Sequence, residues 1–323
     1  MWFFNQRNYD QEGSRMLSTY KPTRIAVTGE LGFIGRNLVR TLQLRDLCYA
    51  HVPLLNADGT EMCVHSTPFD AWCAVLHKVD VLVHNAAIVG SDVVDLRPED
   101  AYNVNVVGTE VVVRAANLMG VPVVYMGTTA CYDCTKYQHC MMDEDSAQHG
   151  HTEYGRQKLV AENWVKRHAK QWMVVRPLFC YGGVGDMNSL ISKSLYAKYT
   201  CQQVHMHLDP KKYKDWLHVD DFVEAILLCI DAELWGNVWN ASYMSPVTPY
   251  DVVKYAETEL SVIWHPDVDY MGNHLVSSGR LRAMGWSPKV SLQEGIERAA
   301  AEIVANLDSY DPLRYSKEMY NDK

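Results

Sequence analysis

The chain has 323 residues, of which 48% are hydrophobic and 21% charged, a balance typical of globular proteins rather than of disordered or fibrous chains. Its formal net charge is −9 and its one short basic run is KKYK at 211–214, which argues against a surface for nucleic acid or for an anionic membrane. No apolar stretch is long enough for a transmembrane helix and no signal peptide is recognisable, so we expect a cytoplasmic protein.

The nine cysteines lie mostly alone inside apolar segments, as reduced structural thiols usually do. One segment differs: CYDCTKYQHC contains Cys131, Cys134, His139 and Cys140. The first two have the spacing of a zinc knuckle, but no second cysteine pair follows at the expected distance. We expect an irregular loop with free thiols and no metal, and a zinc site is the alternative.

Apolar runs alternate with amphipathic segments through the first half of the chain. We predict strands at RIAVTG (24–29), LCYAHV (47–52), EMCVH (61–65), VDVLVHNAA (79–87), VPVVYMGTT (121–129) and WMVVRP (172–177). We predict helices from about Phe33 to Leu44, after Thr67, over 98–120 and over 153–171. Strands that read as continuous runs of Val, Ile and Leu and alternate with helices predict a parallel sheet covered on both faces.

The pattern becomes less regular after Pro177, although DWLHVDDFVEAILLCID predicts one more strand and helix. We therefore expect a doubly wound, Rossmann-type α/β domain over 22–178, with a return segment at about 215–242. A smaller mixed C-terminal lobe for substrate is expected over 179–214 and 243–310. Residues 1–21 would form a loose leader and 311–323 a tail. The expected ligand site is the cleft between the lobes.

The segment VTGELGFIG, residues 27–35, places three glycines between a predicted strand and a predicted helix. Gly29 would permit a tight turn, Gly32 would let the backbone approach a pyrophosphate, and Gly35 would let the helix pack close to the sheet. The helix that starts at Phe33 and Ile34 would offer its free N–H groups to phosphates. This context favours a dinucleotide site over a simple glycine-rich turn.

The segment YGRQK places Tyr154 and Lys158 four residues apart on a predicted helix, hence on one face. A lysine ammonium beside a tyrosine hydroxyl favours the phenolate and lowers the phenol pKa from about 10. Such a phenol can move a proton at a carbinol carbon while a hydride moves to a nicotinamide. The alternative is a solvated Tyr/Lys pair. Thr128 follows an upstream strand at the edge where open parallel sheets bind ligands.

Together these segments resemble the extended short-chain dehydrogenase/reductases, specifically the NAD-dependent epimerase/dehydratase family that modifies nucleotide sugars. The resemblance runs from roughly Arg24 to Ala300. The segments that carry it are TGELGFIG, HNAA, NVNVVGT, YGRQK, RPLFCYG, KDWLHVDD and MGWSPKVSLQEGI.

The resemblance implies roles for individual residues. Tyr154 would be the general acid/base, Lys158 its electrostatic partner and a ribose ligand, and Thr128 a hydrogen-bonding partner of the reacting sugar oxygen. The implied dinucleotide site consists of Gly29, Gly32, Phe33, Ile34, Gly35, Ala86, Ala87, Asn105, Tyr154 and Lys158. The implied substrate contacts are Thr129, Arg176, Phe179 and Lys214.

The chain also departs from the family pattern. Thr129 and Ala130 stand where the dehydratases have an Asp-Glu pair, which disfavours a 4,6-dehydratase. Phe179 replaces the asparagine of RPxNxYG, so the usual diphosphate contacts are in doubt. Lys214 replaces an arginine, which keeps the charge but loses the bidentate fork.

The acid that usually ends the second strand and contacts the ribose is missing around His51–Pro53. Asp58 is nearby but expected in a loop. Arg36 could meet a 2′-phosphate or be a solvated helix residue. The cofactor is therefore NAD or NADP, with NAD slightly favoured.

Three functions stay open. The first is an NAD(P)-dependent nucleotide-sugar epimerase that transiently oxidises a sugar hydroxyl. The second is an NAD(P)H-dependent 4-keto-nucleotide-sugar reductase, which uses the same Thr128, Tyr154 and Lys158. The third is a non-catalytic dinucleotide-sensing module, against which the intact pair of Tyr154 and Lys158 argues. Family members often dimerise through two helices per subunit, here those at about 101–119 and 153–170, so we expect a homodimer.

Overall fold

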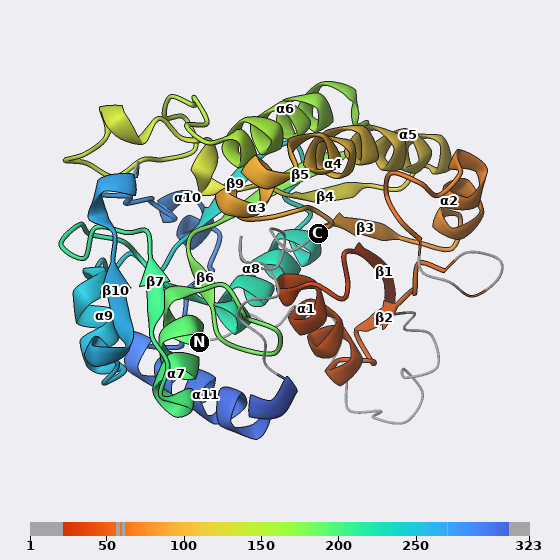
Figure 1. Ribbon diagram of the computed structural model, residues 1–323. Helices are drawn as coiled ribbons and strands as arrows, with labels where there is room; N and C mark the ends of the chain where they lie inside the picture. The colour runs from red at the N-terminus through yellow and green to blue at the C-terminus, as the bar shows by residue number, and fades with distance from the viewer. Residues whose placement is uncertain (1–21, 56–58, 60–61, 270, 310–323) are drawn as a thin grey trace.

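A parallel six-stranded sheet lies at the centre of the computed structural model, which describes residues 22–55, 59, 62–269 and 271–309 (Figure 1). The strand order is β2-β1-β3-β4-β5-β9, and every neighbouring pair is parallel. The bounds are β1 Thr23–Thr28, β2 Tyr49–His51, β3 Val81–His84, β4 Val123–Met126, β5 Trp172–Pro177 and β9 Val238–Ala241. The expected leader, the tail and Asp58 lie outside the described residues.

Helices cover both faces of the sheet, because successive residues of each strand point to opposite sides. On one face, Ile25 and Val27 pack with α1 (Phe33–Leu44) and α8 (Val219–Asp231). On the other face, Ala26 and Leu82 pack with α2 (Phe69–Leu76), α5 (Thr109–Met119) and α6 (Glu153–His168). The predicted doubly wound Rossmann-type α/β fold is confirmed.

The helix predicted over 98–120 is divided. It consists of α4 (Pro98–Tyr102), a π-helical segment η1 (Asn103–Gly108) and α5, which ends at Gly120 in the left-handed conformation. The short helix α3 (Ser91–Leu96) precedes it. Single π-helical turns inside helices are frequent at functional sites, and this one carries Asn105.

The strand predicted over 61–65 is wrong for the described residues of that segment. Residues 64–66 form a turn, in which the backbone N–H of Cys63 donates to the hydroxyl of Thr67 at 2.8 Å. Thr67 therefore closes this turn instead of capping the next helix, and α2 begins at Phe69 without a side-chain cap. Val64 is buried although it lies in the turn, which explains the apolar pattern.

The second lobe is built from two small parallel sheets and four helices. Strand β6 (Cys180–Tyr181) pairs with β8 (Leu217–His218), and β7 (Val204–Met206) pairs with β10 (Val262–Trp264). The helices are α7 (Leu190–Thr200), α9 (Pro249–Tyr255), α10 (Gly279–Ala283) and α11 (Leu292–Ala305). Short 3₁₀ turns are η2 (Thr129–Cys131), η3 (Cys134–Lys136), η4 (Glu259–Ser261), η5 (Pro266–Val268) and η6 (Leu307–Ser309).

A separate apolar core unites α7, α9 and α11 and includes Ile191, Trp216, Val252 and Ile296. This core is distinct from those of the two faces of the large sheet. None of the helices within the described residues has the length and apolar character required to cross a bilayer.

Candidate active site

The glycine loop forms a turn that presses against the neighbouring strand end. Gly29 has φ +67°, and a Cβ there would lie 2.8 Å from the Cα of Ala86. A Cβ at Gly35 would lie 2.8 Å from the Cα of Glu30, so the helix approaches the loop closely. Gly32 is exposed, and a Cβ there would meet only the Gly29 carbonyl, at 3.2 Å. The loop therefore leaves an open cradle at Gly32, as a pyrophosphate requires.

Helix α1 begins directly at this cradle. Its first residues, Phe33 and Ile34, have backbone N–H groups for which an α-helix supplies no internal partner. The positive end of the helix dipole lies at the same place, so the cradle suits a phosphate anion. The residues present fit a dinucleotide.

A buried hydrogen-bond chain holds Ala86 beside the loop. The Thr28 hydroxyl accepts the N–H of Ala86 at 3.0 Å and contacts His84 Nδ1 at 2.8 Å; His84 Nε2 contacts the Thr109 hydroxyl at 2.9 Å. Thr109 donates its own proton to a backbone carbonyl, so it accepts from His84 Nε2, and Nδ1 accepts from Thr28. Burial, and secondarily Lys158, lowers the pKa of His84 to about 3, so the imidazole is neutral.

Asn105, an expected dinucleotide contact, binds the backbone of Ile88, just after Ala86 and Ala87. Its Oδ1 accepts from the N–H of Ile88 at 2.8 Å, and its Nδ2 donates to the Ile88 carbonyl and to Gln157 Oε1, both at 3.1 Å. The side chain is buried. Asn105 therefore fixes the loop that follows Ala86 and Ala87 to α6, which makes it a positioning residue for that loop.

The first turn of α6 packs against the loop that carries Thr128. The hydroxyl of Thr152 caps the helix by accepting from the N–H of Gly155 at 3.0 Å. A Cβ at Gly155 would lie 2.7 Å from the Ala130 carbonyl oxygen, so only glycine allows this approach. Tyr154 lies on this turn, and Thr128 caps η2 by accepting from the N–H of Ala130 at 3.2 Å. The structure thus brings together the elements that carry Thr128 and Tyr154, two of the three predicted catalytic residues.

Lys158 lies one turn further along α6 and is 4% exposed. Its Nζ lies 4.3 Å from the centroid of the Tyr125 ring. Burial lowers the pKa of Lys158 to about 7, and the nearby carboxylate of Glu162 opposes part of that effect. In its ammonium form, a buried lysine acts strongly on a neighbouring phenol, because water screens its field little. Tyr154 lies one turn earlier on the same helix.

Arg176, an expected substrate contact, lies in the interior of the protein. Its side chain is fully buried, and its guanidinium contacts Glu162 at 3.0 and 2.5 Å and donates to the Tyr132 hydroxyl at 2.6 Å. No part of it reaches solvent in this structure, and its contact with substrate stays a prediction. It is the centre of a buried polar network. Thr129 is also buried, and its hydroxyl donates to the Pro177 carbonyl at 3.3 Å.

Lys214, another expected substrate contact, is also in the interior. It is fully buried, with Nζ 3.0 Å from Asp269 and 2.5 Å from the Gly272 carbonyl oxygen. Its charge is therefore neutralised inside the second lobe. Phe179, the other expected substrate residue, has φ +36°, a strained conformation for a side chain of this size, and its ring packs against Trp216.

The cysteine segment is part of a small core. Cys131 and Cys134 are buried and Cys140 is exposed. Burial raises the pKa of Cys131 to about 12 and that of Cys134 to about 11, so both are thiols, and Cys134 Sγ lies 3.0 Å from His274 Nδ1. Within the described ranges, no three His, Cys, Asp or Glu side chains are placed to share a metal ion.

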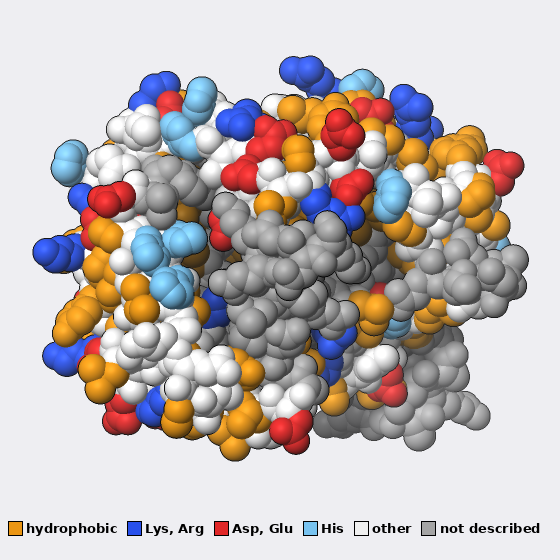
Figure 2. Space-filling view, viewed as in Figure 1, with side chains coloured by type: hydrophobic (Ala, Val, Ile, Leu, Met, Phe, Trp, Pro, Cys, Tyr) orange, Lys and Arg blue, Asp and Glu red, His pale blue; other side chains and the backbone are white. Residues whose placement is uncertain are grey.

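Charged residues that the sequence analysis missed lie where the two lobes meet. Burial lowers the pKa of Lys193 on α7, and the negative charge of Asp92 on α3 opposes part of that effect. His207 Nδ1 lies 4.0 Å from the same carboxylate, and its ring packs against His265. Histidines gather on this face (Figure 2). Only a spatial arrangement reveals this group, because Asp92 lies 101 positions before Lys193 in sequence.

Comparison with known proteins supports the assignment by family. The NAD dependent epimerase/dehydratase family matches residues 25–242. A curated relative, dTDP-D-glucose 4,6-dehydratase from Mus musculus, is 23% identical over 313 residues, which cover 85% of this chain and 87% of the relative.

Two solved structures share the fold. Epimerase Mth375 from Methanothermobacter thermautotrophicus aligns with a TM-score of 0.79 and 21% identity, over 91% of this chain and 96% of that chain. MoeE5 in complex with UDP-glucose and NAD aligns with a TM-score of 0.78 and 21% identity, over 88% of this chain and 99% of that chain. The chain belongs to the NAD dependent epimerase/dehydratase family.

Proposed function

We propose that this chain is an NAD(P)-dependent nucleotide-sugar epimerase. The observation that carries the proposal is the packing of the Tyr154 turn against the Thr128 loop, beside the buried ammonium of Lys158. The next residues of that loop, Thr129 and Ala130, offer no carboxyl group. A dehydratase needs an additional acid and base to eliminate water, whereas an epimerase needs only the one proton carrier that Tyr154 would supply.

The chain's own residues would act as follows. The glycine cradle, with Phe33 and Ile34, would hold the dinucleotide phosphates, and the bound nicotinamide would take up a hydride and give it back. Thr128 would orient a sugar hydroxyl by a hydrogen bond. Tyr154 would remove the proton from that hydroxyl oxygen and later return it, and Lys158 would stabilise the phenolate.

The test is the product. The purified chain is incubated with UDP-, dTDP- and GDP-sugars and a catalytic amount of NAD or NADP, and products are read by mass spectrometry and NMR. We expect a stereoisomer of unchanged mass and no net change in nicotinamide absorbance. A product lighter by one water would indicate a dehydratase. A product heavier by two hydrogens, with loss of NAD(P)H, would indicate the reductase. Binding without turnover of any sugar would indicate the sensing module.

We also propose that the chain forms a homodimer through α5 and α6, which lie side by side on one face of the sheet (Figure 1). Apolar side chains on the outer surface of this helical layer support the proposal: Val107 is 39% exposed, Leu118 63% and Val160 48%. Sedimentation velocity should give a dimer, and Val160→Glu should give a monomer. A monomeric wild type would contradict the proposal.

We also propose which ligand each lobe binds. Residues 22–178 with 215–242 would bind the dinucleotide, and residues 179–214 with 243–310 would bind the nucleotide sugar.

A further inference from the structure

The carboxyl ends of β1 and β2 bring two side chains together that are 21 positions apart in sequence. His51 is the last residue of β2 and pairs with Ile25 of β1, and the N–H of Val52 continues the pairing to the Ile25 carbonyl at 2.8 Å. Glu30 follows Gly29 in the glycine loop, just beyond the end of β1. Both side chains therefore lie at the sheet edge where open parallel sheets bind their ligands.

The two side chains form one unit. Glu30 Oε2 lies 2.8 Å from His51 Nε2, and the side chains are 20% and 11% exposed. A carboxylate only accepts hydrogen bonds, so His51 donates from Nε2. Within the described part of the chain, Oε1 of Glu30 has no hydrogen-bond partner. His51 thus holds the carboxylate in one orientation and leaves an acceptor oxygen available.

The Glu30–His51 pair lies at the end of β2, where this chain lacks the acid that selects between NAD and NADP in many dinucleotide-binding folds. In dinucleotide-binding folds an acid at the end of the second strand accepts from the ribose 2′-hydroxyl, and an arginine nearby accommodates a 2′-phosphate instead. Here the strand ends in His51, and the acid comes from the adjoining glycine loop. A 2′-phosphate next to Glu30 would meet a like charge.

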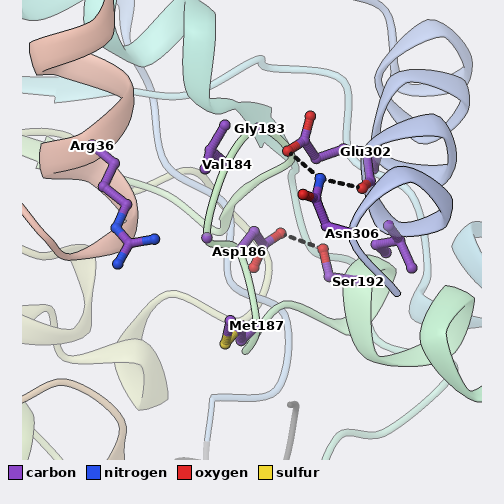
Figure 3. Close-up of a pocket in the computed structure, with 11 residues that line it drawn as sticks. Arg36, Gly183, Val184, Asp186, Met187, Ser192, Glu302 and Asn306 are labelled. Carbon is purple, nitrogen blue, oxygen red and sulfur yellow. Dashed lines mark hydrogen bonds between the residues drawn. The ribbon is translucent and has the colours of Figure 1, made fainter. Parts of the chain in front are cut away.

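Arg36 does not offset that repulsion. Its Nε donates to the Leu31 carbonyl at 2.6 Å, and its Cδ would lie 3.5 Å from a Cβ at Gly185. Figure 3 shows Arg36 beside a cavity of about 200 Å³ that it lines with the loop at 183–187 and with α11. The cation therefore lies against the second lobe, and among the described residues no hydrogen bond or ion pair joins it to Glu30 or His51.

We propose that Glu30, held by His51, contacts the adenosine ribose and makes the chain bind NAD more tightly than NADP. The carboxylate accepts a hydrogen bond from the 2′-hydroxyl and repels a 2′-phosphate. The proposal rests on the proposed function, in that it requires a dinucleotide at the glycine loop. Glu30 is the specificity residue, and His51 is its positioning residue.

The test uses the full chain and two ligands that differ by one phosphate: ADP-ribose and 2′-phospho-ADP-ribose, titrated by calorimetry. These ligands probe the ribose site without any catalytic step. We expect the wild type to bind ADP-ribose at least about tenfold more tightly. Glu30→Gln keeps the size but removes the charge, and should narrow this ratio by about tenfold, with 2′-phospho-ADP-ribose gaining affinity.

Three further variants serve as controls for this result. Glu259→Gln removes an exposed carboxylate of the second lobe and should leave the ratio unchanged. His51→Ala should narrow the ratio in part, and adding Glu30→Gln to it should give no more than Glu30→Gln alone, because both act through one carboxylate. His51→Ala also tests the proposal if Glu30→Gln does not fold.

The outcomes separate the two proposals. Equal affinity of the wild type for the two ligands, or a ratio that Glu30→Gln and His51→Ala leave unchanged, overturns the role of Glu30 while the dinucleotide site stands. Binding of neither ligand by the folded wild type overturns the dinucleotide site and, with it, this inference.

Discussion

The ammonium of Lys158 lies 4.3 Å from the ring centroid of Tyr125, enclosed between α6 and β4. An aromatic face attracts a cation, but it replaces little of the hydration that the ammonium loses. Burial therefore destabilises the ammonium and lowers the pKa of Lys158 to about 7, so the ammonium and the amine are both populated near neutral pH. This relationship makes both the stability of the fold and the field at Tyr154 depend on pH near neutrality.

Stability should rise with pH because of Lys158. In the unfolded chain its pKa is near 10.4 and in the folded chain about 7, so between these values the unfolded state binds more protons. The free energy of unfolding then increases with pH. Between pH 7 and pH 9, the free energy of unfolding of the wild type, measured with urea, should rise by about 2 kcal/mol more than that of Lys158→Met. Lys78→Met, which changes an exposed lysine, should follow the wild type; equal pH dependence in Lys158→Met would contradict the shift.

Tyr154→Phe should lower turnover by roughly 10²- to 10⁴-fold, because the phenol is the proposed proton carrier. Dinucleotide affinity and thermal stability should change little, since the ring remains. Steady-state kinetics with the sugar substrate measures the effect, and Tyr250→Phe, at an exposed position on α9, is the matched control. Wild-type turnover in Tyr154→Phe would refute the mechanism.

Gly32→Val should abolish dinucleotide binding while the chain still folds. The glycine is exposed and its added Cβ would approach only the Gly29 carbonyl, so the fold tolerates it, but the side chain would fill the phosphate cradle. Gly279→Val, at the start of α10, introduces the same side chain away from the cradle and should bind normally. Calorimetric titration with NADH distinguishes the two, and undiminished binding by Gly32→Val would mean that the loop is only a turn.

Arg176→Met should destabilise the fold by roughly 3–5 kcal/mol, because it leaves the buried Glu162 carboxylate without its main partner. Replacing both residues, Arg176→Met with Glu162→Leu, should recover most of the loss. Arg298→Met breaks an exposed pair with Glu294 and should change stability by less than about 1 kcal/mol. Urea unfolding measures all three. An Arg176→Met chain of wild-type stability with a raised KM for sugar would instead support Arg176 as a substrate contact.

The elements that pack against the large sheet could be predicted because their own residues carry the signal. Ile34, Leu38 and Leu42 recur every four positions, and the predicted bounds of α1 are the observed ones. Val64 shows the limit of such reasoning. It is buried because it packs against Gly108, 44 positions later. A buried residue in a turn is apolar just as one in a strand is, so the sequence pattern does not distinguish the two.

Some residues of the candidate site could also be predicted from their own segment, and others could not. The pair Tyr154 and Lys158 could be predicted because both lie on one helix, where spacing alone decides the shared face. Whether Arg176 faces a ligand or the interior depends on Glu162, which another element supplies, so the motif around Arg176 could not reveal it. The contact between Glu30 and His51 likewise depends on the pairing of β1 with β2.

The position of β9 has a consequence for the order of folding. This last strand of the large sheet pairs with β5, yet residues 178–237 separate the two along the chain. Closing so long a loop reduces the conformational entropy of the chain before the contacts between β5 and β9 can stabilise it. During synthesis β5 would therefore emerge with one edge unpaired, and the sheet could be completed only after much of the second lobe had been made. A chain truncated after Pro177 would expose that edge and be prone to aggregate.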